Sequence, residues 1–278
     1  MLINGNTALI AHLGYPTTSF KAPMIFNPFF VERRINAVVV PMGVVADDYP
    51  QVLRSLARVT NFHGALVTMP HKVTTVNLLD ASSTAVRIAG SCNAIVRRRD
   101  GTLLGDMFDG EGFVRGLRSN GRQTKGARVL ITGSGGVGSA IAASLAAAGV
   151  AHLSLYDVRQ HTAAGLARRL CEQFPELSVS VDTNDPAGHD IVVNATPLGM
   201  ETDDPLPIDV DRLEPTAFVG EVVLSQELTP FLRAARDRGC EFQIGTDMLF
   251  EQIPAYLEFF GFGTTTAAQL RQLARFEH

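Results

Sequence analysis

A glycine-rich turn between two apolar segments is the feature of this sequence with the most direct chemical meaning. Gly133-Ser-Gly135-Gly-Val-Gly138 follows the apolar run 129–132 and opens an Ala-rich segment typical of a helix. The first glycine permits a tight turn, the second lets a phosphate approach the backbone, and the third allows close packing of helix on strand. The helix N-terminus favours the phosphate charge. This pattern predicts a dinucleotide site; the alternative is an ordinary strand–turn–helix connection that contains glycines.

An acidic residue at the end of the next expected strand bears on the choice of cofactor. Asp157 lies 19 residues after Gly138. A carboxylate there can accept hydrogen bonds from both hydroxyls of the adenosine ribose, and it repels a 2′-phosphate. We therefore predict that NAD is preferred over NADP. Arg159 could tolerate some NADP, so exclusive use of NAD is not predicted, and the alternative role of Asp157 is a solvated residue at a strand end.

Alternating strand-like and helix-like segments would position these residues, and such alternation predicts mostly parallel sheets. Strands are expected at 7–14, 37–44, 64–70, 127–133, 152–157, 190–196, 217–223 and 240–245. Helices are expected at 23–35, 49–59, 110–121, 136–149, 162–174, 229–239, 248–261 and 265–277. The pattern predicts two α/β units, and composition alone allows the last two helices to join either unit.

Length and composition limit the class of protein. The 278 residues correspond to about two domains at roughly 150 residues each. A net charge of −4, with 46% hydrophobic and 19% charged residues, is typical of a globular chain and gives no general attraction to nucleic acid or membrane. Three separated cysteines form neither a disulfide framework nor a zinc pattern, which favours the cytoplasm and predicts no metal. No signal peptide or membrane-spanning segment is predicted.

Six further motifs occur in the order in which they occur in one known family. The sequence resembles the shikimate dehydrogenase family, which includes quinate/shikimate dehydrogenases, over nearly its whole length. The motifs that carry this resemblance are Gly64-Ala-Leu-Val-Thr-Met-Pro-His-Lys72 (family G-x-N-V-T-x-P-x-K), Gly90-Ser-Cys-Asn93-Ala (G-A-x-N-T), Gly105-Asp-Met-Phe-Asp109-Gly110 (G-D-N-T-D-G), Asn194-Ala-Thr-Pro-Leu-Gly-Met200 (N-A-T-x-x-G-M), Thr229-Pro-Phe-Leu232 (T-P-L-L) and Met248-Leu-Phe-Glu-Gln252 (M-L-x-x-Q).

The resemblance implies a fold and an activity. It implies an N-terminal, mostly parallel α/β substrate domain at 1–110, joined by returning C-terminal helices at 245–278, and a Rossmann-type NAD-binding domain at 111–244. It also implies oxidation of a ring hydroxyl of a shikimate- or quinate-like cyclic alcohol to the ketone. The hydride goes to the nicotinamide, so the protein must accept the hydroxyl proton. By the resemblance, Lys72 and Asp109 form that catalytic pair, whereas Lys72 taken alone is more typical of a solvated surface residue.

The resemblance also implies two sets of binding residues. The cofactor set is Gly133, Gly135, Gly136, Val137, Gly138, Asp157, Arg159, Asn194, Ala195, Thr196, Val223, Gly245, Met248 and Leu249. The substrate set is Ser19, Phe20, Lys21, Ala22, Thr68, Asn93 and Gln252. The hydroxyl and amide groups in the second set can donate or accept hydrogen bonds, which suits a polyol; their alternative roles are helix capping and loop bracing. His71, beside Lys72, is interpreted as a bystander.

Five polar positions of the family pattern are apolar in this sequence. The family's S-x-S-P, whose serines hold the substrate carboxylate, aligns with Phe20-Lys-Ala22-Pro, and three further polar positions are occupied by Leu66, Met107 and Phe108. A buried carboxylate without partners is costly. Lys21 or a hydroxyl at 15–19 could rebuild the clamp, an alignment shift could place Ser19 at the first serine, or the substrate could be less polar than shikimate.

Three functions therefore stay open at the level of the sequence. They are a shikimate- or quinate-type dehydrogenase, a dehydrogenase of the same fold for a less polar or aminated cyclic alcohol, and a non-catalytic NAD-binding sensor. Retention of both Lys72 and Asp109 argues against the sensor. The expected partner is a small cyclic alcohol or ketone, and the oligomeric state is left open between monomer and homodimer.

Overall fold

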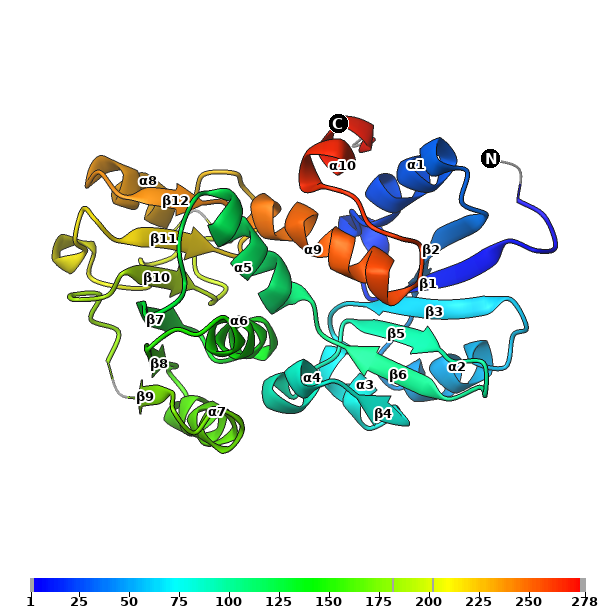
Figure 1. Cartoon of the computed structure of the whole chain (residues 1–278), viewed down its shortest axis with the longest axis horizontal. Helices are drawn as coiled ribbons and strands as arrows, with labels where there is room; N and C mark the ends of the chain where they lie inside the picture. Colours follow the sequence, from blue (N-terminus) through cyan, green and yellow to red (C-terminus); the bar gives the residue numbers. More distant parts are fainter. Residues whose placement is uncertain (1–2, 182, 202, 276–278) are drawn as a thin grey trace. The chain divides into compact units, whose positions relative to one another are not determined.

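Two units, each built on one six-stranded sheet, make up the chain (Figure 1). Unit 1 comprises residues 1–108 and 253–278, and unit 2 comprises 109–252. The computed structural model describes residues 3–181, 183–201 and 203–275, except for the side chain of Ser19. The α/β fold class with two parallel-rich sheets, predicted from the alternation of segments, is confirmed.

The unit 1 sheet has the strand order β2-β1-β3-β5-β6-β4, in which β5 runs antiparallel to β3 and β6 while the other pairings are parallel. Its strands are β1 (Ala8–Gly14), β2 (Ala37–Gly43), β3 (Phe62–Val67), β4 (Ala81–Ser82), β5 (Ala94–Arg97) and β6 (Leu103–Asp106). Its helices are the 3-10 turn η1 (Thr17–Ser19), α1 (Pro23–Arg33), α2 (Tyr49–Leu56), α3 (Lys72–Val76), α4 (Thr84–Ala89) and α10 (Ala267–Leu273).

The unit 2 sheet is parallel throughout, in the order β12-β11-β10-β7-β8-β9. Counted within the unit this is 3-2-1-4-5-6, the order of dinucleotide-binding sheets. Its strands are β7 (Arg128–Thr132), β8 (His152–Tyr156), β9 (Ser178–Val181), β10 (Ile191–Asn194), β11 (Phe218–Glu221) and β12 (Glu241–Gln243). Its helices are α5 (Asp109–Ser119), α6 (Gly136–Ala147), α7 (Gln160–Gln173), the 3-10 turn η2 (Val210–Arg212) and α8 (Pro230–Asp237), and α9 (Gly245–Phe259) crosses the division between the units.

The expected segments match these elements, with shifts at their ends. Gly245, expected as the end of a strand, begins α9, and α10 is shorter than the expected helix 265–277, whose last two residues lie outside the described part. Six short helices and strands were not predicted, namely α3, β4, α4, β5, β6 and β9, and neither were the 3-10 turns η1 and η2. Runs of two to six residues carry too little periodicity to be recognised.

Small residues allow the helices of unit 2 to lie close together. The middle of α6 is a run of buried alanines with Ile141 and Leu145. A Cβ atom added at Gly110 of α5 would lie 2.0 Å from the carbonyl oxygen of Ala140. This close approach fixes the first turn of α5, which contains Asp109, against α6.

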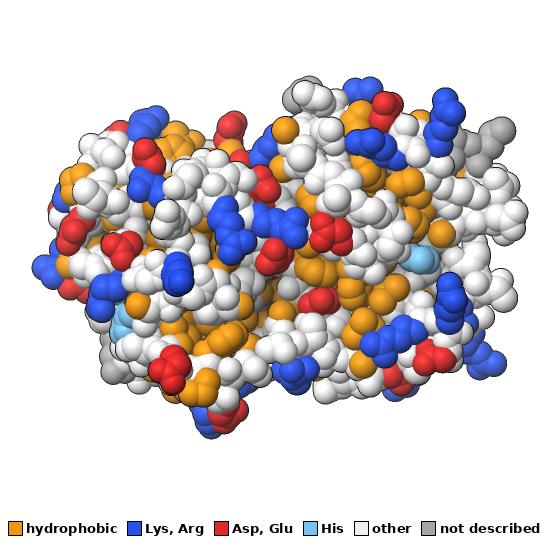
Figure 2. Space-filling model, viewed as in Figure 1, with side chains coloured by type: hydrophobic (Ala, Val, Ile, Leu, Met, Phe, Trp, Pro, Cys, Tyr) orange, Lys and Arg blue, Asp and Glu red, His pale blue; other side chains and the backbone are white. Residues whose placement is uncertain are grey.

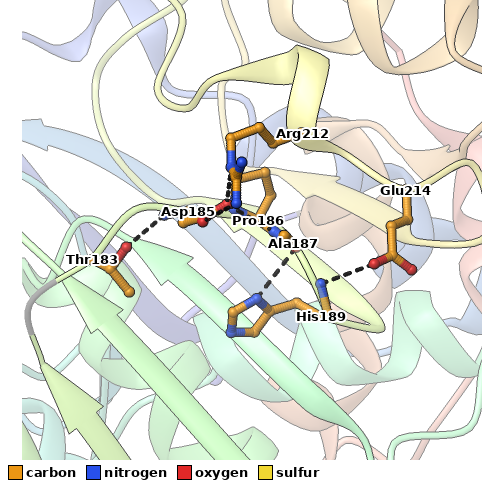
Figure 3. Close-up of polar contacts among 8 residues, drawn as sticks. Thr183, Asp185, Pro186, Ala187, His189, Arg212 and Glu214 are labelled. Atoms are coloured by element: carbon orange, nitrogen blue, oxygen red, sulfur yellow. Dashed lines mark hydrogen bonds and ion pairs between the residues drawn. The ribbon is translucent and has the colours of Figure 1, made fainter.

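The connection from β9 to β10 is held by local polar contacts (Figure 3). Arg212 donates two hydrogen bonds to Asp185, at 2.8 and 2.6 Å, and these bonds lower the pKa of Asp185 to about 2. The Ala187 N–H also donates to Asp185, and His189 Nδ1 lies 3.3 Å from the Pro186 carbonyl oxygen. The contacts fix the loop that leads into β10.

Charged side chains of both signs are interspersed on the face shown in Figure 2. None of the helices in the described ranges combines the length and apolar content needed to cross a bilayer. The same residues include no cluster of three or more His, Cys, Asp or Glu side chains that could hold a metal ion.

Candidate active site

The residues predicted to hold the cofactor follow the carboxyl ends of the strands in unit 2. Ligands of parallel sheets with this strand order bind outside that edge. The residues at or just after the strand ends are Gly133 (β7), Asp157 (β8), Asn194 (β10), Val223 (β11) and Gly245 (β12). Segments up to 112 residues apart therefore lie along one edge of a single sheet.

The glycine turn between β7 and α6 has the geometry that its motif predicts. Gly133 has φ +92°, a region favourable to glycine, and a Cβ there would lie 2.7 Å from the carbonyl carbon of Ala195. A Cβ at Gly138 would lie 1.9 Å from the carbonyl oxygen of Gly133. Gly135 caps α6 and has nothing within 4 Å of an added Cβ. Two glycines thus permit close packing, and the third leaves open space before the helix.

Asp157 connects the end of β8 to this turn. Its Oδ2 accepts a hydrogen bond from the Ser134 N–H at 2.8 Å, and its Oδ1 accepts one from the Arg159 N–H at 2.9 Å. The carboxylate is buried, with Arg159 Nε 3.6 Å away and the Arg159 side chain mostly exposed. The acid is thereby held beside the glycine turn rather than solvated.

An unsatisfied hydroxyl in the turn fits a bound dinucleotide. Ser134 Oγ is buried and has no hydrogen-bond partner in the part of the chain that the structure describes. Buried hydroxyls are normally paired, so a polar group from a ligand would satisfy it. The open space at Gly135 and the N-terminus of α6 favour the same ligand. Ser134 was not among the predicted site residues, although its place inside the motif is a signal for it.

A buried glutamate fixes the segment after β10. Asn194 Nδ2 donates to Glu221 Oε1 at 2.6 Å and to the Leu198 carbonyl oxygen at 2.9 Å, and Asn194 Oδ1 accepts the Thr196 hydroxyl at 2.6 Å. Thr229, the N-cap of α8, donates its hydroxyl to Glu221. Burial raises the pKa of Glu221, while the bonds from Thr229 and Asn194 oppose the rise. Glu221 was missed by the sequence analysis because an acid at a strand end is unremarkable until its burial is known.

We expect replacement of Glu221 by glutamine to change the pH dependence of stability. The raised pKa means that the folded state binds the proton more tightly than the unfolded state. The Glu221 carboxyl therefore contributes to the free energy of unfolding at a pH below its pKa in the unfolded state. This contribution is lost as the pH rises through its pKa in the folded state. Gln cannot ionise, so the stability of E221Q relative to the parent should increase from acid to neutral pH. Urea unfolding across this range measures it; the exposed Glu227→Gln is the control, and a difference that stays flat with pH contradicts the expectation.

Four of the remaining predicted cofactor residues, Val223, Gly245, Met248 and Leu249, lie in or near the first turn of α9. A Cβ at Gly245 would lie 2.1 Å from the carbonyl oxygen of Val223, so the segments after β11 and β12 touch there. Val223 and Met248 are buried, and Leu249 is half-buried. The side chains of Val223, Met248 and Leu249 thus form an apolar surface after the ends of β11 and β12. Gly136 and Val137 are half-buried in the first turn of α6.

Three predicted site residues of unit 1 lie within a hydrogen-bonded framework around β3. The Thr68 N–H donates to the Leu13 carbonyl oxygen at 2.9 Å, and the Val67 N–H donates to that of Asn93 at 2.8 Å. The Cys92 N–H donates to the Lys72 carbonyl oxygen at 2.9 Å. Asn93 Oδ1 accepts the Phe108 N–H at 2.9 Å, so part of its bonding capacity braces the chain.

His71, the neighbour of Lys72, is a core residue. Its ring stacks on Tyr49 with centroids 4.0 Å apart, and its Nε2 lies 2.8 Å from the Val44 carbonyl oxygen. Burial lowers its pKa. Both its packing and its bonding partner belong to the interior of unit 1, in agreement with its interpretation as a bystander.

The aligned serine positions have distinct environments. Phe20 is buried and stacks on His12 of β1, with ring centroids 4.0 Å apart. Ala22 is half-buried at the N-cap of α1, and Lys21 is half-buried beside it. Ser19 lies in η1, and its side chain is outside the described part. Of the other apolar departures, Leu66 and Met107 are buried, and Phe108 contacts Tyr256 and Phe259 edge-on.

Asp109 and Gln252 are buried residues of unit 2. Asp109 is in the first turn of α5. Gln252 is on α9, where its Cβ lies 2.6 Å from a Cβ added at Gly112. Gln252 Oε1 is buried and lacks a hydrogen-bond partner among the described residues. Lys72 belongs to the other unit.

The strand order of unit 2, its glycine turn and the acid after β8 define a protein with a Rossmann-type domain for NAD or NADP. Comparison with known proteins adds the family. The model of the shikimate dehydrogenase substrate binding domain matches residues 13–95, and that of the ThiF family matches residues 117–174. A curated relative, shikimate dehydrogenase (NADP(+)) of Rubrobacter xylanophilus, is 35% identical over 257 residues, covering 90% of this chain and 89% of its own.

Solved structures give the same result over nearly the full chain. Shikimate 5-dehydrogenase of Listeria monocytogenes, in complex with shikimate and NAD, has a TM-score of 0.90 at 25% identity and covers 98% of this chain and 97% of its own. The 5-ketofructose reductase of Gluconobacter sp. strain CHM43 has a TM-score of 0.88 at 25% identity, with coverage of 97% and 98%. The chain therefore belongs to the shikimate dehydrogenase family of NAD(P)-dependent oxidoreductases, as the motifs predict.

Proposed function

We propose that this protein oxidises a ring hydroxyl of a shikimate- or quinate-like cyclic alcohol to the ketone, and reduces the ketone in the reverse direction. The observation that carries the proposal is family membership together with retention of Lys72 and Asp109 in their motifs. When bound, NAD or NADP supplies the hydride acceptor. Lys72 accepts the hydroxyl proton and Asp109 balances its charge, while Thr68, Asn93 and Gln252 orient the ring hydroxyls.

The chemistry of the pair is the transfer of one proton. An amine that accepts the hydroxyl proton becomes an ammonium, and a carboxylate beside it offsets that charge. The experiment is a panel of cyclic alcohols incubated with NAD or NADP, with reduced cofactor followed by absorbance. If no alcohol in the panel yields reduced cofactor although the protein binds NADH, the result favours the non-catalytic sensor.

A second substrate class has specific support in this chain. Phe20 and Ala22 occupy the aligned positions of the family's two serines, and Leu66 that of its asparagine. These changes favour a less polar or aminated cyclic alcohol over shikimate itself. One neighbour in fold is named for reduction of 5-ketofructose.

We also propose that the enzyme is cytoplasmic and is a monomer or a homodimer.

We propose NAD as the preferred cofactor, although the curated relative is named for NADP(+). Support comes from the buried Asp157 carboxylate held beside the glycine turn by the Ser134 and Arg159 N–H groups. A 2′-phosphate at that point would meet a fixed negative charge.

Cofactor preference should therefore depend on Asp157. We expect kcat/KM with NAD to exceed that with NADP by at least about tenfold, about 1.4 kcal/mol. Asp157→Asn should reduce this ratio, and Arg159→Ala should weaken only the use of NADP. Steady-state rates with both cofactors test the expectation. A preference of the parent for NADP by tenfold or more would overturn the NAD proposal.

A further inference from the structure

A buried histidine on β1 of unit 1 has one ring nitrogen without a hydrogen-bond partner among the described residues. His12 is 7% exposed, and its Nδ1 has no hydrogen-bond partner in the described part of the chain. Two other buried histidines are paired: His71 Nε2 with the Val44 carbonyl oxygen, and His189 Nε2 with the Ser154 hydroxyl at 2.8 Å. A buried polar group without a partner costs free energy, so each such group requires an explanation.

The neighbours of His12 include predicted substrate residues. Its ring stacks on Phe20. In the parallel sheet His12 pairs with Leu66 of β3, so the two side chains share a face. A Cβ at Gly14 would lie 2.4 Å from Thr68 Cγ2 and 2.9 Å from Phe20 Cζ, so Phe20 reaches the end of β1 where Thr68 lies.

His12 itself is not the counter-ion for a substrate carboxylate. Burial and the nearby charge of Lys72 lower the pKa of His12 to about 4. The imidazole is therefore neutral at physiological pH and cannot act as a counter-ion. Phe20 offers no donor where the family pattern has a hydroxyl, and Leu66 offers none on the face shared with His12. A carboxylate beside Phe20 and Leu66 would find no hydrogen-bond donor on those two side chains to replace its lost hydration.

Resting on the proposed dehydrogenase function, we propose that His12 and Phe20 select an uncharged substrate. Phe20 packs against the part of the ring where shikimate carries its carboxylate. His12 Nδ1, which has no partner among the described residues, forms a hydrogen bond with a hydroxyl group of that substrate. The substrate class is then a neutral polyhydroxylated alcohol or ketone. If the ammonium group of Lys21 instead paired with a substrate carboxylate, the enzyme would prefer a carboxylated substrate over an uncharged one.

Shikimate and its methyl ester provide a matched pair of probes, because they share one ring and differ in the charge of one group. We expect the parent enzyme to show kcat/KM with NAD at least tenfold higher for the ester. The same comparison with uncharged cyclic polyols and their carboxylated counterparts extends the test. A tenfold or larger preference for shikimate would overturn the inference and leave the dehydrogenase function in place.

Two variants separate a substrate role of His12 from a structural one. His12→Phe keeps an aromatic ring against Phe20 but removes the nitrogens. It should raise KM for the ester at least tenfold without changing NADH affinity, and it should not lower the melting temperature, because an unpaired buried group is removed. Phe20→Ser should shift the preference toward shikimate. A His12→Phe protein with a lower melting temperature and an unchanged KM would overturn the inference. If the parent binds NADH but oxidises none of the probe alcohols, the proposed function is overturned as well.

Discussion

Replacement of Lys72 by alanine should reduce kcat by roughly 10²–10⁴-fold, the usual contribution of a proton-transfer group, while leaving the affinity for NADH unchanged. The reason is that the hydride can reach the cofactor only as the hydroxyl proton leaves. Lys72 begins α3 directly after the Thr68–His71 turn, in a segment that bonds to Leu13 of β1 and to Cys92, just before β5. Single-turnover formation of NADH and fluorescence titration with NADH measure the two quantities separately.

The control for Lys72→Ala is Lys125→Ala, which removes an exposed lysine of unit 2. It should change kcat by less than about twofold, since surface substitutions far from a site have small effects. Burial is the main cause of the lowered pKa of His12 and the charge of Lys72 adds to it, so loss of Lys72 should let that pKa rise slightly. If Lys72→Ala retains parental kcat, the assignment of Lys72 to proton transfer fails, whatever the substrate.

The dinucleotide unit could be predicted from the sequence in some detail, and the physical reason is local. At Gly133 and Gly138 an added Cβ would collide with backbone atoms, so the motif and the turn require one another. The two central strands of unit 2, β7 and β10, contain the apolar runs Val129–Ile131 and Ile191–Val193, which are typical of strands buried on both faces of a parallel sheet. The glycine motif and each apolar run are contained in fewer than ten consecutive residues.

The substrate unit was less predictable because its informative contacts connect distant segments. His12 on an apolar strand is indistinguishable in sequence from an ordinary core histidine. Its importance emerges from the stack with Phe20 and from the absence of a hydrogen-bond partner for Nδ1 among the described residues. Glu221 is similar, since Asn194 lies 27 residues before it and Thr229 lies 8 residues after it. No spacing rule connects such residues before the strand order is known.

The glycine turn should respond in two different ways to the addition of a single methyl group. Gly135→Ala should fold normally, because the residue has an extended backbone and nothing lies within 4 Å of the added Cβ. The methyl group would occupy the space through which a pyrophosphate approaches the N-terminus of α6. We therefore expect affinity for NADH to fall at least about tenfold, about 1.4 kcal/mol, with stability unchanged.

Gly138→Ala should reduce both stability and binding. Its Cβ would lie 1.9 Å from the Gly133 carbonyl oxygen, a backbone atom that can yield only if α6 moves away from the turn. Overpacking of this kind costs about 1–3 kcal/mol of unfolding free energy. Gly165→Ala in α7 is the matched control, because its Cβ would make an ordinary contact of 3.5 Å with Arg169 and a helical alanine is favoured over glycine by about 0.5–1 kcal/mol.

Urea unfolding and NADH fluorescence titration distinguish the three glycine variants, and the chain contains no tryptophan whose emission would overlap the titration. The separation matters because a variant that merely unfolds says nothing about where the cofactor binds. A stable Gly135→Ala protein with weakened NADH binding places the phosphates at this turn. Parental NADH affinity in Gly135→Ala would show that the dinucleotide does not approach the backbone there, since a methyl group in that path cannot be neutral.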